Sequence, residues 1–402
     1  MAKNHDGSTQ QQDSDHYDGY ATELRDNFVL SENLGRGSFG LVKLCISKDN
    51  EKEYAVKIVS KRALQKKAGF SRRFPRNAGP VRTPLDQVYA EISILKKLDH
   101  PHIVKLFEVY DDENSDDLCM VFEFLPGGPI APEFPTDEVL SEEKAKKYFV
   151  HTFLAMEYLH HQNIIHRDIK PENILVDAED NAKLADLGES IELHGDDDIV
   201  KGTKGTPGFL APELVDLDST DEARGMPVDI WALGVTLYGC VFGDIPFTGE
   251  TRMELYENIA KQPLIIPKRP PVSDECRDMI ARLLEKDPKL RITGNQIREH
   301  PWLMSYEGTI PAHKTNRGAV VSISSADIEN SVSKVNTANI ITIAKIKSML
   351  MRKRSSRFSN LVPPGGSGTG SPLSQMMSSV NSQQLTASTA DAESNIQTST
   401  SM

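Results

Sequence analysis

The chain has 402 residues, more than one compact domain usually holds and enough for a two-lobed core with additional segments. Hydrophobic residues make up 38% and charged residues 26%, which is ordinary for a soluble protein. The net charge of −12 argues against a general nucleic-acid-binding protein. No apolar run approaches the roughly 20 residues that a bilayer span needs, so we expect no integral membrane contact.

The four cysteines, Cys45, Cys119, Cys240 and Cys276, are far apart in the sequence and form no C-x-x-C pair. This spacing indicates neither a zinc site nor a disulfide framework, so we expect reduced thiols in the core of a cytoplasmic or nuclear protein. Residues 1–27 are polar and carry no apolar signal region, and we expect them to be a disordered tail.

A glycine-rich segment follows from Phe28, between two strand-like runs. A dinucleotide-binding turn also contains G-x-G-x-x-G, but it would open a helix, whereas residues 41–46 alternate as a strand does. Glycines let the backbone approach phosphate groups closely. The sequence therefore predicts a phosphate-binding hairpin that comprises Leu34, Gly35, Arg36, Gly37, Ser38, Phe39, Gly40, Leu41 and Val42.

Lys57 lies in the next predicted strand, residues 54–58, and Glu91 in a predicted helix. We expect Lys57 to bind the α- and β-phosphates and to pair with Glu91. Between them, residues 61–87 carry eight Lys or Arg against one Asp, with three prolines. The stretch of about 66–87 is either a solvated insertion without helix or core, or a docking arm for an acidic partner.

Two more strands are predicted at residues 106–110 and 118–125, before Pro126 breaks the pattern. Ser141 then begins a predicted core helix, with acidic residues in its first turn and apolar residues at helical spacing up to Leu159. His160 and His161 are interpreted as exposed residues at the end of this helix rather than metal ligands.

The stretch from 165 to 173 reads I-H-R-D-I-K-P-E-N, and Asp186-Leu187-Gly188 follows thirteen residues after Asn173. A carboxylate, a lysine and an amide on one loop, with a second carboxylate nearby, are the groups that phosphoryl transfer needs. Asp168 would orient a hydroxyl group, Lys170 would steady the phosphoryl group, and Asn173 with Asp186 would hold Mg²⁺. A charged surface turn is the alternative, and the order of the other motifs disfavours it.

These motifs together resemble the eukaryotic protein kinases over residues 28–303. The resemblance implies an α+β, bilobal kinase fold with a small β-rich lobe, a large helical lobe and disordered tails, and it implies ATP and Mg²⁺ as cofactors. It also implies that His166 packs within the loop, and that Leu187 stands where the family usually has Phe. Further nucleotide contacts are implied for Ala55, Phe122, Glu123, Leu125 and Leu175.

The resemblance also assigns residues beyond the loop. Glu213 is expected to pair with Arg291, and Asp229 to bind the backbone of the catalytic loop. Thr206 is expected near Asp168. Arg167 is expected to pair with a negative charge. This charge comes from a phosphorylated Thr203 or from Asp196, Asp197 and Asp198, although the three aspartates can equally be solvated.

Three features resemble the calcium/calmodulin-dependent protein kinase kinases: the basic insert, residues 87–101 and residues 346–355. That resemblance implies downstream protein kinases as substrates, phosphorylated on an activation-loop Thr. These are the calmodulin-dependent kinases and AMP-activated protein kinase. It also implies Ca²⁺/calmodulin as a partner and a monomer. The insert has fewer prolines than the vertebrate pattern, and the tail is Ile-rich and lacks Trp.

Residues 304–330 are predicted to be a linker and residues 361–402 a disordered tail. Residues 331–360 carry seven Lys or Arg and no acid, interleaved with apolar residues, as in calmodulin targets. We expect them to block the active site until calmodulin binds. The alternatives are a packed helix, or a helix on a membrane surface in a calmodulin-independent kinase. A catalytically dead scaffold with the same fold is a further alternative.

Overall fold

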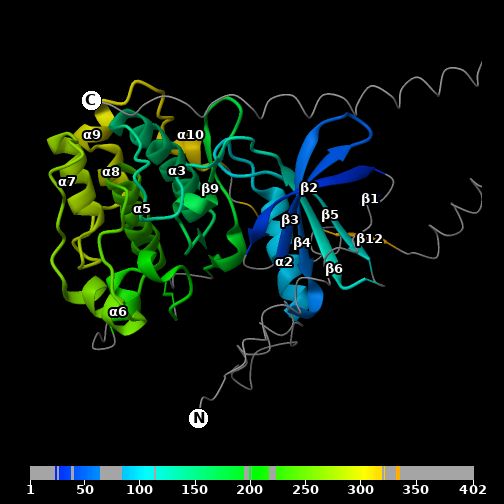
Figure 1. Cartoon of the computed structure of the whole chain (residues 1–402), viewed down its shortest axis with the longest axis horizontal. Helices are drawn as coiled ribbons and strands as arrows, with labels where there is room; N and C mark the ends of the chain where they lie inside the picture. The colour runs from blue at the N-terminus through cyan, green and yellow to red at the C-terminus, as the bar shows by residue number, and fades with distance from the viewer. Residues whose placement is uncertain are drawn as a thin grey trace, which may run out of the picture. The chain divides into compact units, whose positions relative to one another are not determined.

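The computed structural model describes residues 23–24, 27–37, 40–63, 84–112, 115–193, 199–200, 202–216, 223–318, 321 and 332–335. The expected tail at 361–402, residues 336–360, nearly all of the expected N-terminal tail and most of the basic insert lie outside this range. The described part of the chain forms a β-rich lobe and a helical lobe, as the sequence predicted (Figure 1).

The small lobe is a seven-stranded sheet in the order β1-β2-β3-β4-β6-β5-β12. Neighbouring strands are antiparallel except β12, which is parallel to β5. The strands are β1 (Glu23–Leu24), β2 (Phe28–Gly37), β3 (Gly40–Ser47), β4 (Glu53–Ser60), β5 (Leu106–Asp112), β6 (Asp117–Glu123) and β12 (Ser333–Val335).

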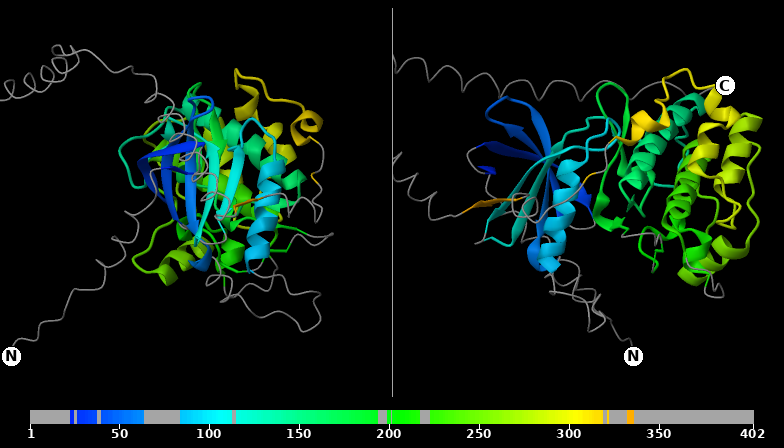
Figure 2. Two further views of the ribbon diagram at one scale, coloured as in Figure 1. Left: turned by 90° about the vertical axis from the view of Figure 1, so that its right-hand side faces the viewer. Right: turned by 180° about the vertical axis from the view of Figure 1, so that it is seen from behind.

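Two apolar clusters stabilise this sheet. One surrounds Phe28, Val56 and Ile58. The other contains Ile92 of helix α2 (Pro84–Lys97) together with Leu118 of β6, so α2 packs on the sheet through this cluster (Figure 2). Burial of such side chains is the main favourable contribution to folding.

Helix α2 begins inside the stretch that we expected to be a helix-free insert. Residues 84–87 form its first turn, so the prediction of an insert without helix up to residue 87 was wrong for these four residues. Proline is tolerated at the start of a helix, because the backbone N–H that it lacks would have no partner there.

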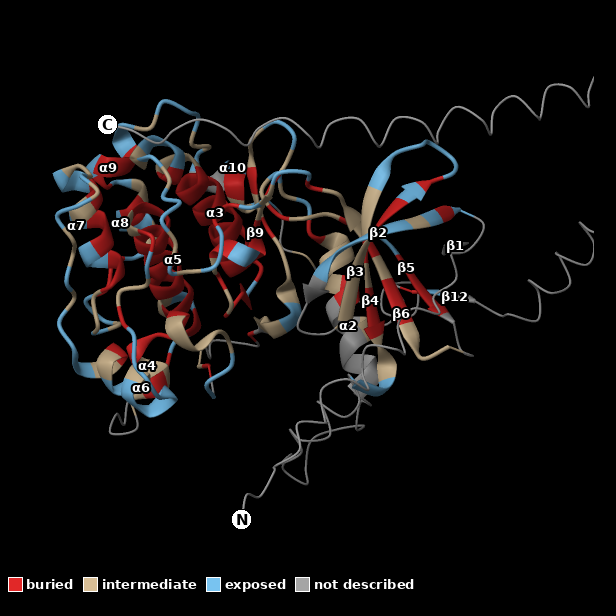
Figure 3. Ribbon diagram, viewed as in Figure 1, coloured by how far each residue is buried: buried red, intermediate tan, exposed pale blue. Residues whose placement is uncertain are grey.

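The large lobe is built around helices α3 (Glu142–His161) and α5 (Gly225–Phe242), whose residues are mostly buried (Figure 3). By length and composition α5 could cross a membrane, but 83% of it is buried inside the lobe, which is typical of a core helix. Around them lie α4 (Pro212–Val215), α6 (Arg252–Lys261), α7 (Asp274–Leu283), α8 (Gly294–Arg298) and α9 (Pro301–Met304).

Helix α3 begins as predicted. The Ser141 side chain accepts a hydrogen bond from the backbone N–H of Lys144 at 3.3 Å, and two acidic residues occupy the first turn. One of these, Glu142, also accepts hydrogen bonds from Ser273 and from the Trp302 indole at 2.6 and 2.8 Å. The start of α3 is thereby connected to α7 and α9.

Short strands before and after α3 carry the loops of the site. They are β7 (Gly128–Pro129), β8 (Ile164–Ile165), β9 (Ile174–Val176), β10 (Ala182–Leu184) and β11 (Ile191–Glu192), with the 3-10 turns η1 (Pro171–Asn173), η2 (Leu187–Glu189) and η3 (Pro207–Phe209). β9 pairs with both β7 and β10, and β8 pairs with β11.

The four cysteines are buried and unpaired, as expected. Burial raises the pKa of the Cys45 thiol to about 11 and that of Cys119 to about 12. These thiols therefore behave as small apolar groups of the core.

The chain beyond residue 303 contains two short ordered elements. Helix α10 (His313–Arg317) packs on α3, and residues 333–335 form β12. Strand β12 therefore lies at the start of residues 331–360, the segment that we expected to block the active site.

Candidate active site

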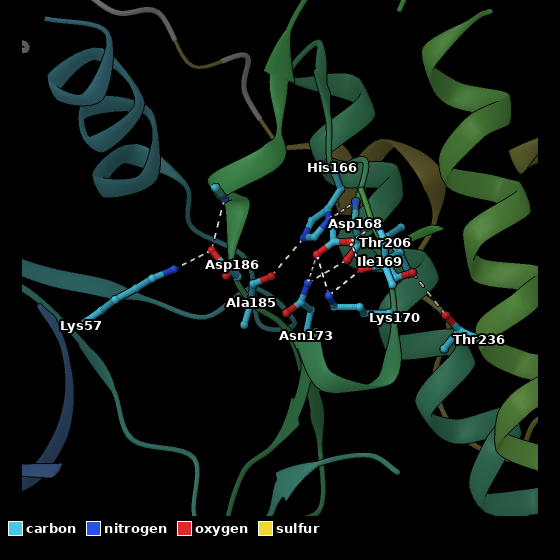
Figure 4. A network of polar contacts seen from close by, with 11 residues as sticks. Lys57, His166, Asp168, Ile169, Lys170, Asn173, Ala185, Asp186, Thr206 and Thr236 are labelled. Atoms are coloured by element: carbon cyan, nitrogen blue, oxygen red, sulfur yellow. Dashed lines mark hydrogen bonds and ion pairs between the residues drawn. The ribbon is translucent and has the colours of Figure 1, made fainter. Parts of the chain in front are cut away.

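The loop between β8 and β9 gathers the predicted catalytic residues (Figure 4). Oδ1 of Asp168 accepts hydrogen bonds from the backbone N–H and the hydroxyl of Thr206 at 3.0 and 2.7 Å. Oδ2 of Asp168 accepts one from the Asn173 amide at 2.9 Å and lies 3.0 Å from Nζ of Lys170. The carboxylate is therefore held in one orientation by three neighbours.

Asn173 is fixed by the same carboxylate. Its Nδ2 donates to the backbone carbonyl of Asp168 at 2.8 Å as well as to Oδ2. Because the amide nitrogen is used for these two bonds, the amide oxygen is the atom suited to coordinate a metal ion. This geometry agrees with the predicted role of Asn173.

Lys57 reaches from β4 toward Asp186 in the turn after β10. Its Nζ lies 2.7 Å from Oδ1 of Asp186, and both side chains are mostly buried. Asp186 has a left-handed backbone with φ of 55° and also accepts a bond from the Gly188 N–H at 3.3 Å. Burial disfavours the charged carboxylate, but the charge and hydrogen bond of Lys57 outweigh it, so the pKa of Asp186 is lowered.

His166 connects the catalytic loop to the segment that carries Asp186. Its Nδ1 accepts from the backbone N–H of Asp168 at 3.2 Å, and its Nε2 lies 3.0 Å from the carbonyl oxygen of Ala185. A ring that accepts at Nδ1 and donates at Nε2 is neutral. The fully buried His166 is therefore a packing and positioning residue, as the sequence analysis expected.

Asp229 of α5 binds the backbone of the catalytic loop, as expected. Its fully buried carboxylate accepts from the backbone N–H of His166 and of Arg167 at 2.9 and 2.8 Å. It also accepts from Nε2 of His160 at 2.8 Å. Burial alone would raise the pKa of Asp229. The hydrogen bond from His160 contributes most to the opposite effect, and the pKa of Asp229 is lowered overall.

The interpretation of His160 as an exposed residue was wrong. Its side chain is buried and binds Asp229, whereas the neighbouring His161 is partly exposed. The sequence showed two adjacent histidines at a helix end. Only the packing of α3 against α5 determines which of them faces the interior.

Thr206 is brought to Asp168 by the glycine that precedes it. Gly205 has a φ of +114°, and a Cβ there would lie 2.6 Å from the carbonyl oxygen of Arg167. A side chain is therefore excluded, and the activation segment can approach the catalytic loop closely. Nζ of Lys170 donates to the Thr206 hydroxyl at 2.7 Å, so the expected proximity of Thr206 to Asp168 is confirmed.

The glycine-rich hairpin lies beside the strand that carries Lys57, in the same sheet. Val42 of β3 is directly opposite Lys57 of β4 in the strand register. A Cβ on Gly40 would lie 1.8 Å from the carbonyl oxygen of Ile58, whereas Gly35 has no atom within 4 Å of the same position. Gly40 is thus required by strand packing, whereas a side chain at Gly35 would meet open space.

The remaining predicted nucleotide contacts come from two different sheets. Ala55 and Phe122 are opposite each other on β4 and β6, and Leu175 is on β9. The Glu123 side chain is occupied, since it accepts from the backbone N–H of Lys105 and pairs with Lys183 at 2.6 Å. The side chains of Arg36, Ser38, Phe39 and Glu91 lie outside the described residues, so the Lys57–Glu91 pair remains a prediction.

The expected ion pair of Glu213 and Arg291 is present. Two hydrogen bonds of 2.7 and 2.8 Å join the guanidinium to the carboxylate. The side chain of Arg291 is 0% exposed and that of Glu213 is 3% exposed.

In Arg167, Nε and Nη2 are buried without a hydrogen-bond partner among the described residues, and burial lowers the pKa of its guanidinium. Residues 196–198, one expected source of a partner charge, lie outside those residues.

Comparison with known proteins agrees with this geometry. The protein kinase domain model matches residues 28–303. The chain belongs to the protein kinase family. A calcium/calmodulin-dependent protein kinase kinase of Caenorhabditis elegans is 39% identical over 81% of this chain and 61% of its own length. The serine/threonine-protein kinase GRIK1 of Arabidopsis thaliana is 38% identical over 70% of this chain and 68% of its own.

The serine/threonine-protein kinase ssp1 of Schizosaccharomyces pombe is 39% identical over 69% of this kinase and 42% of its own length. The kinase described here thus spans about half the length of several curated relatives. The shared region comprises the kinase domain, which in these relatives is of the serine/threonine type by name.

Several residues that hold the segment after the kinase domain in place carried no signal in the sequence. Among them are Asn316, Gln162 and Val332, which connect the segment after the kinase domain to both lobes. Each is a common residue type in an unremarkable context. Only the three-dimensional path of the chain gives them a role.

Proposed function

We propose that this chain is an ATP-dependent protein serine/threonine kinase that phosphorylates an activation-loop Thr of downstream protein kinases. The observation that carries the proposal is the position of Asp168, whose carboxylate is held by Thr206, Asn173 and Lys170. A carboxylate held in this way can accept the proton of a substrate hydroxyl group.

In the reaction, the substrate hydroxyl oxygen forms a bond to the γ-phosphorus, and the bond from this phosphorus to the β-phosphate oxygen breaks. The hydroxyl proton passes to Asp168. Lys170 lies 3.0 Å from Asp168 and can offset the negative charge of the transferred group. Lys57 would position the α- and β-phosphates, since its Nζ already lies beside Asp186.

The residues present also fit Mg²⁺. Asn173 offers an amide oxygen and Asp186 an ionised carboxylate, and hard oxygen ligands are those that Mg²⁺ prefers. A bound Mg²⁺ would neutralise phosphate charge.

The serine/threonine preference is supported by Lys170, which contacts both Asp168 and the hydroxyl of Thr206 at 2.7 Å. The preference for protein kinase substrates is supported by the basic insert and by the similarity to the C. elegans relative. Regulation by Ca²⁺/calmodulin is supported by the name of that relative and by the basic, apolar composition of residues 331–360.

The proposal is tested with purified full-length chain, Ca²⁺/calmodulin, Mg²⁺-ATP and a calmodulin-dependent protein kinase that has been made catalytically inactive. We expect phosphate on the activation-loop Thr of that substrate. Replacing this Thr by Ala in a matched substrate should remove the signal. Tight ATP binding without phosphate transfer to any protein or peptide would instead identify a catalytically dead scaffold.

A further inference from the structure

The segment after the kinase domain is first anchored on the large lobe. Asn316 of α10 is buried, and its amide nitrogen donates to the Leu154 carbonyl and to the Glu157 carboxylate at 3.0 and 2.7 Å. Its amide oxygen lies 2.9 Å from Nε2 of His100. Four residues beyond α10, the backbone N–H of Val321 donates to Oε1 of Gln162 at 2.7 Å. The chain therefore leaves the large lobe along α3.

Residues 332–335 then lie on the edge of the small-lobe sheet. Strand β12 pairs in parallel with β5, with Ser333 opposite Tyr110 and Val335 opposite Asp112 (Figure 2). A strand added to an exposed edge satisfies backbone groups that the edge would otherwise present to solvent. This pairing makes the segment part of the sheet.

Val332 anchors the strand in an apolar groove between α2 and β5. Its side chain is only 6% exposed and belongs to a cluster with Ile92 of α2, Leu106 and Val109 of β5, and Leu118 of β6. Partly buried residues of α2 pack against the same cluster. Val332 thus contacts a core that α2 shares.

The part of β5 that receives β12 also holds α2 by a polar contact. Asp111 is 4% exposed, and the Tyr89 hydroxyl of α2 donates a hydrogen bond to its carboxylate. Lys61 lies 2.8 Å from the other carboxylate oxygen. Pairing of β12 with β5 therefore stabilises the part of the sheet that α2 contacts.

We propose that the groove between α2 and β5 is the docking surface for residues 332–335, and that docking is required for full phosphotransfer activity. The reason is that α2 carries Glu91, the expected partner of Lys57. Val332 is in this sense a positioning residue that acts through α2. The proposal rests on the kinase activity but not on regulation by calmodulin.

The test uses full-length chains and two readouts, turnover of a short peptide substrate and amide hydrogen exchange in α2. We expect Val332→Asp to lower turnover about tenfold and to accelerate exchange in α2, because a buried charge empties the groove. Val139→Asp is the matched control, since Val139 is 39% exposed on the large lobe. Equal values for the two variants would overturn the proposal.

A peptide of residues 328–337, added to the Val332→Asp variant, separates docking from misfolding. If the groove is intact but empty, the wild-type peptide restores turnover and slows exchange in α2, and the same peptide with Asp at position 332 does not. Failure of the wild-type peptide at millimolar concentration to change either readout would count against the proposal.

A double-mutant cycle with Glu91→Gln tests whether Val332 acts through α2. Val332→Ala should lower turnover about threefold in the wild-type chain and have little effect when Glu91 is already replaced, because effects that act through one contact are not additive. Equal fold-losses in both backgrounds would show that Val332 contributes to stability only, and the proposal would be wrong.

Discussion

Lys57 and Asp186 form an ion pair between the two lobes, with Nζ of Lys57 2.7 Å from Oδ1 of Asp186. Lys57 is fixed by the register of β4 between β3 and β6, and Asp186 by the turn that follows β10. The groups predicted to bind phosphate and metal are thus already side by side. Leu187 is partly buried against the core of the large lobe.

Asp168→Asn should reduce phosphate transfer by roughly 10² to 10⁴ and leave nucleotide binding nearly unchanged. In the proposed reaction Asp168 acts on the acceptor hydroxyl, whereas Lys57 and Asp186 would bind the nucleotide and metal. Turnover of a peptide and titration with a fluorescent ATP analogue measure the two effects. Asp99→Asn is the control, because that side chain is 88% exposed. Near wild-type turnover would remove Asp168 from the proposed role.

Removing one partner of the pair between Glu213 and Arg291 should destabilise the large lobe by about 3 to 5 kcal/mol, because the other charge is left buried without a counterion. Arg291 also donates to the carbonyl oxygens of Pro227 and Glu285, so Arg291→Met should be at least as damaging as Glu213→Gln. Chemical denaturation measures both. Arg282→Met, at an exposed i,i+4 pair, should change stability by less than 1 kcal/mol.

Low pH should destabilise the kinase domain through two stacked imidazoles, His102 and His151, whose ring centroids are 4.0 Å apart. Burial lowers the pKa of His151 to about 3 and that of His102 to about 4. Below about pH 6.5 the unfolded chain therefore binds protons that the folded chain does not. The free energy of unfolding accordingly falls as the pH is lowered from about 6.5, down to about pH 4 for His102 and about pH 3 for His151.

The magnitude is at most about 1.4 kcal/mol per pH unit for each histidine. The melting temperature measured from pH 7 to pH 5 gives the slope. His151→Asn should flatten this slope, because the variant lacks one of the two titrating groups. The amide oxygen of Asn can still accept the hydrogen bond that the Ala182 N–H donates to Nδ1 of His151 at 3.1 Å, so the local structure should be kept. His161→Asn serves as the control. An unchanged slope in the His151 variant would rule out this origin.

How far the sequence predicts this molecule depends on how local each signal is. The loop from His166 to Asn173 and the Asp186 turn were predicted because the chemistry needs particular residue types at fixed spacing. Even Thr206 and Asp229 follow from motifs. His160, by contrast, was misassigned, because its burial depends on how two helices pack.

The same reason explains what was missed at the ends of elements. Pro84 begins α2 within a stretch of basic and proline residues, and only the packing of Ile92 on the sheet makes that helix stable. Strand β12 has three residues, too few to form a periodic pattern, and its partner β5 lies more than 200 positions earlier. Pairing over such a separation leaves no local trace in the sequence.

Deletion of residues 66–82 should spare activity on a short peptide and lower activity on an intact protein kinase about tenfold, if the basic insert docks an acidic partner. The deletion ends before Pro84, so the first turn of α2 is kept. A variant of unchanged length, with Arg72, Arg73 and Arg76 replaced by Gln, tests charge separately. Equal losses on both substrates would show that the insert is structural.

Release of autoinhibition can be tested with a shortened chain, and the structure determines where that chain should end. A chain that ends at residue 330 lacks Val332 and β12, so it would combine loss of inhibition with loss of a core side chain. A chain that ends at residue 337 keeps the strand and removes the basic segment. We therefore expect this shorter chain to be active in EGTA and indifferent to calmodulin.

The full chain should be weakly active until Ca²⁺ and calmodulin are both present. If the blocked state is favoured about 100-fold, calmodulin must bind the open state several kcal/mol more tightly to reverse it. Ile343 and Phe358 are fifteen residues apart, about 22 Å on a helix, and are the predicted anchors for the two calmodulin lobes. Ile343→Asp with Phe358→Asp should lower calmodulin affinity while the rate in EGTA stays low or rises. Peptide turnover by both chains, each with EGTA and with Ca²⁺/calmodulin, decides the matter. Equal rates of the two chains in EGTA would exclude autoinhibition by residues 338–402, whatever calmodulin does.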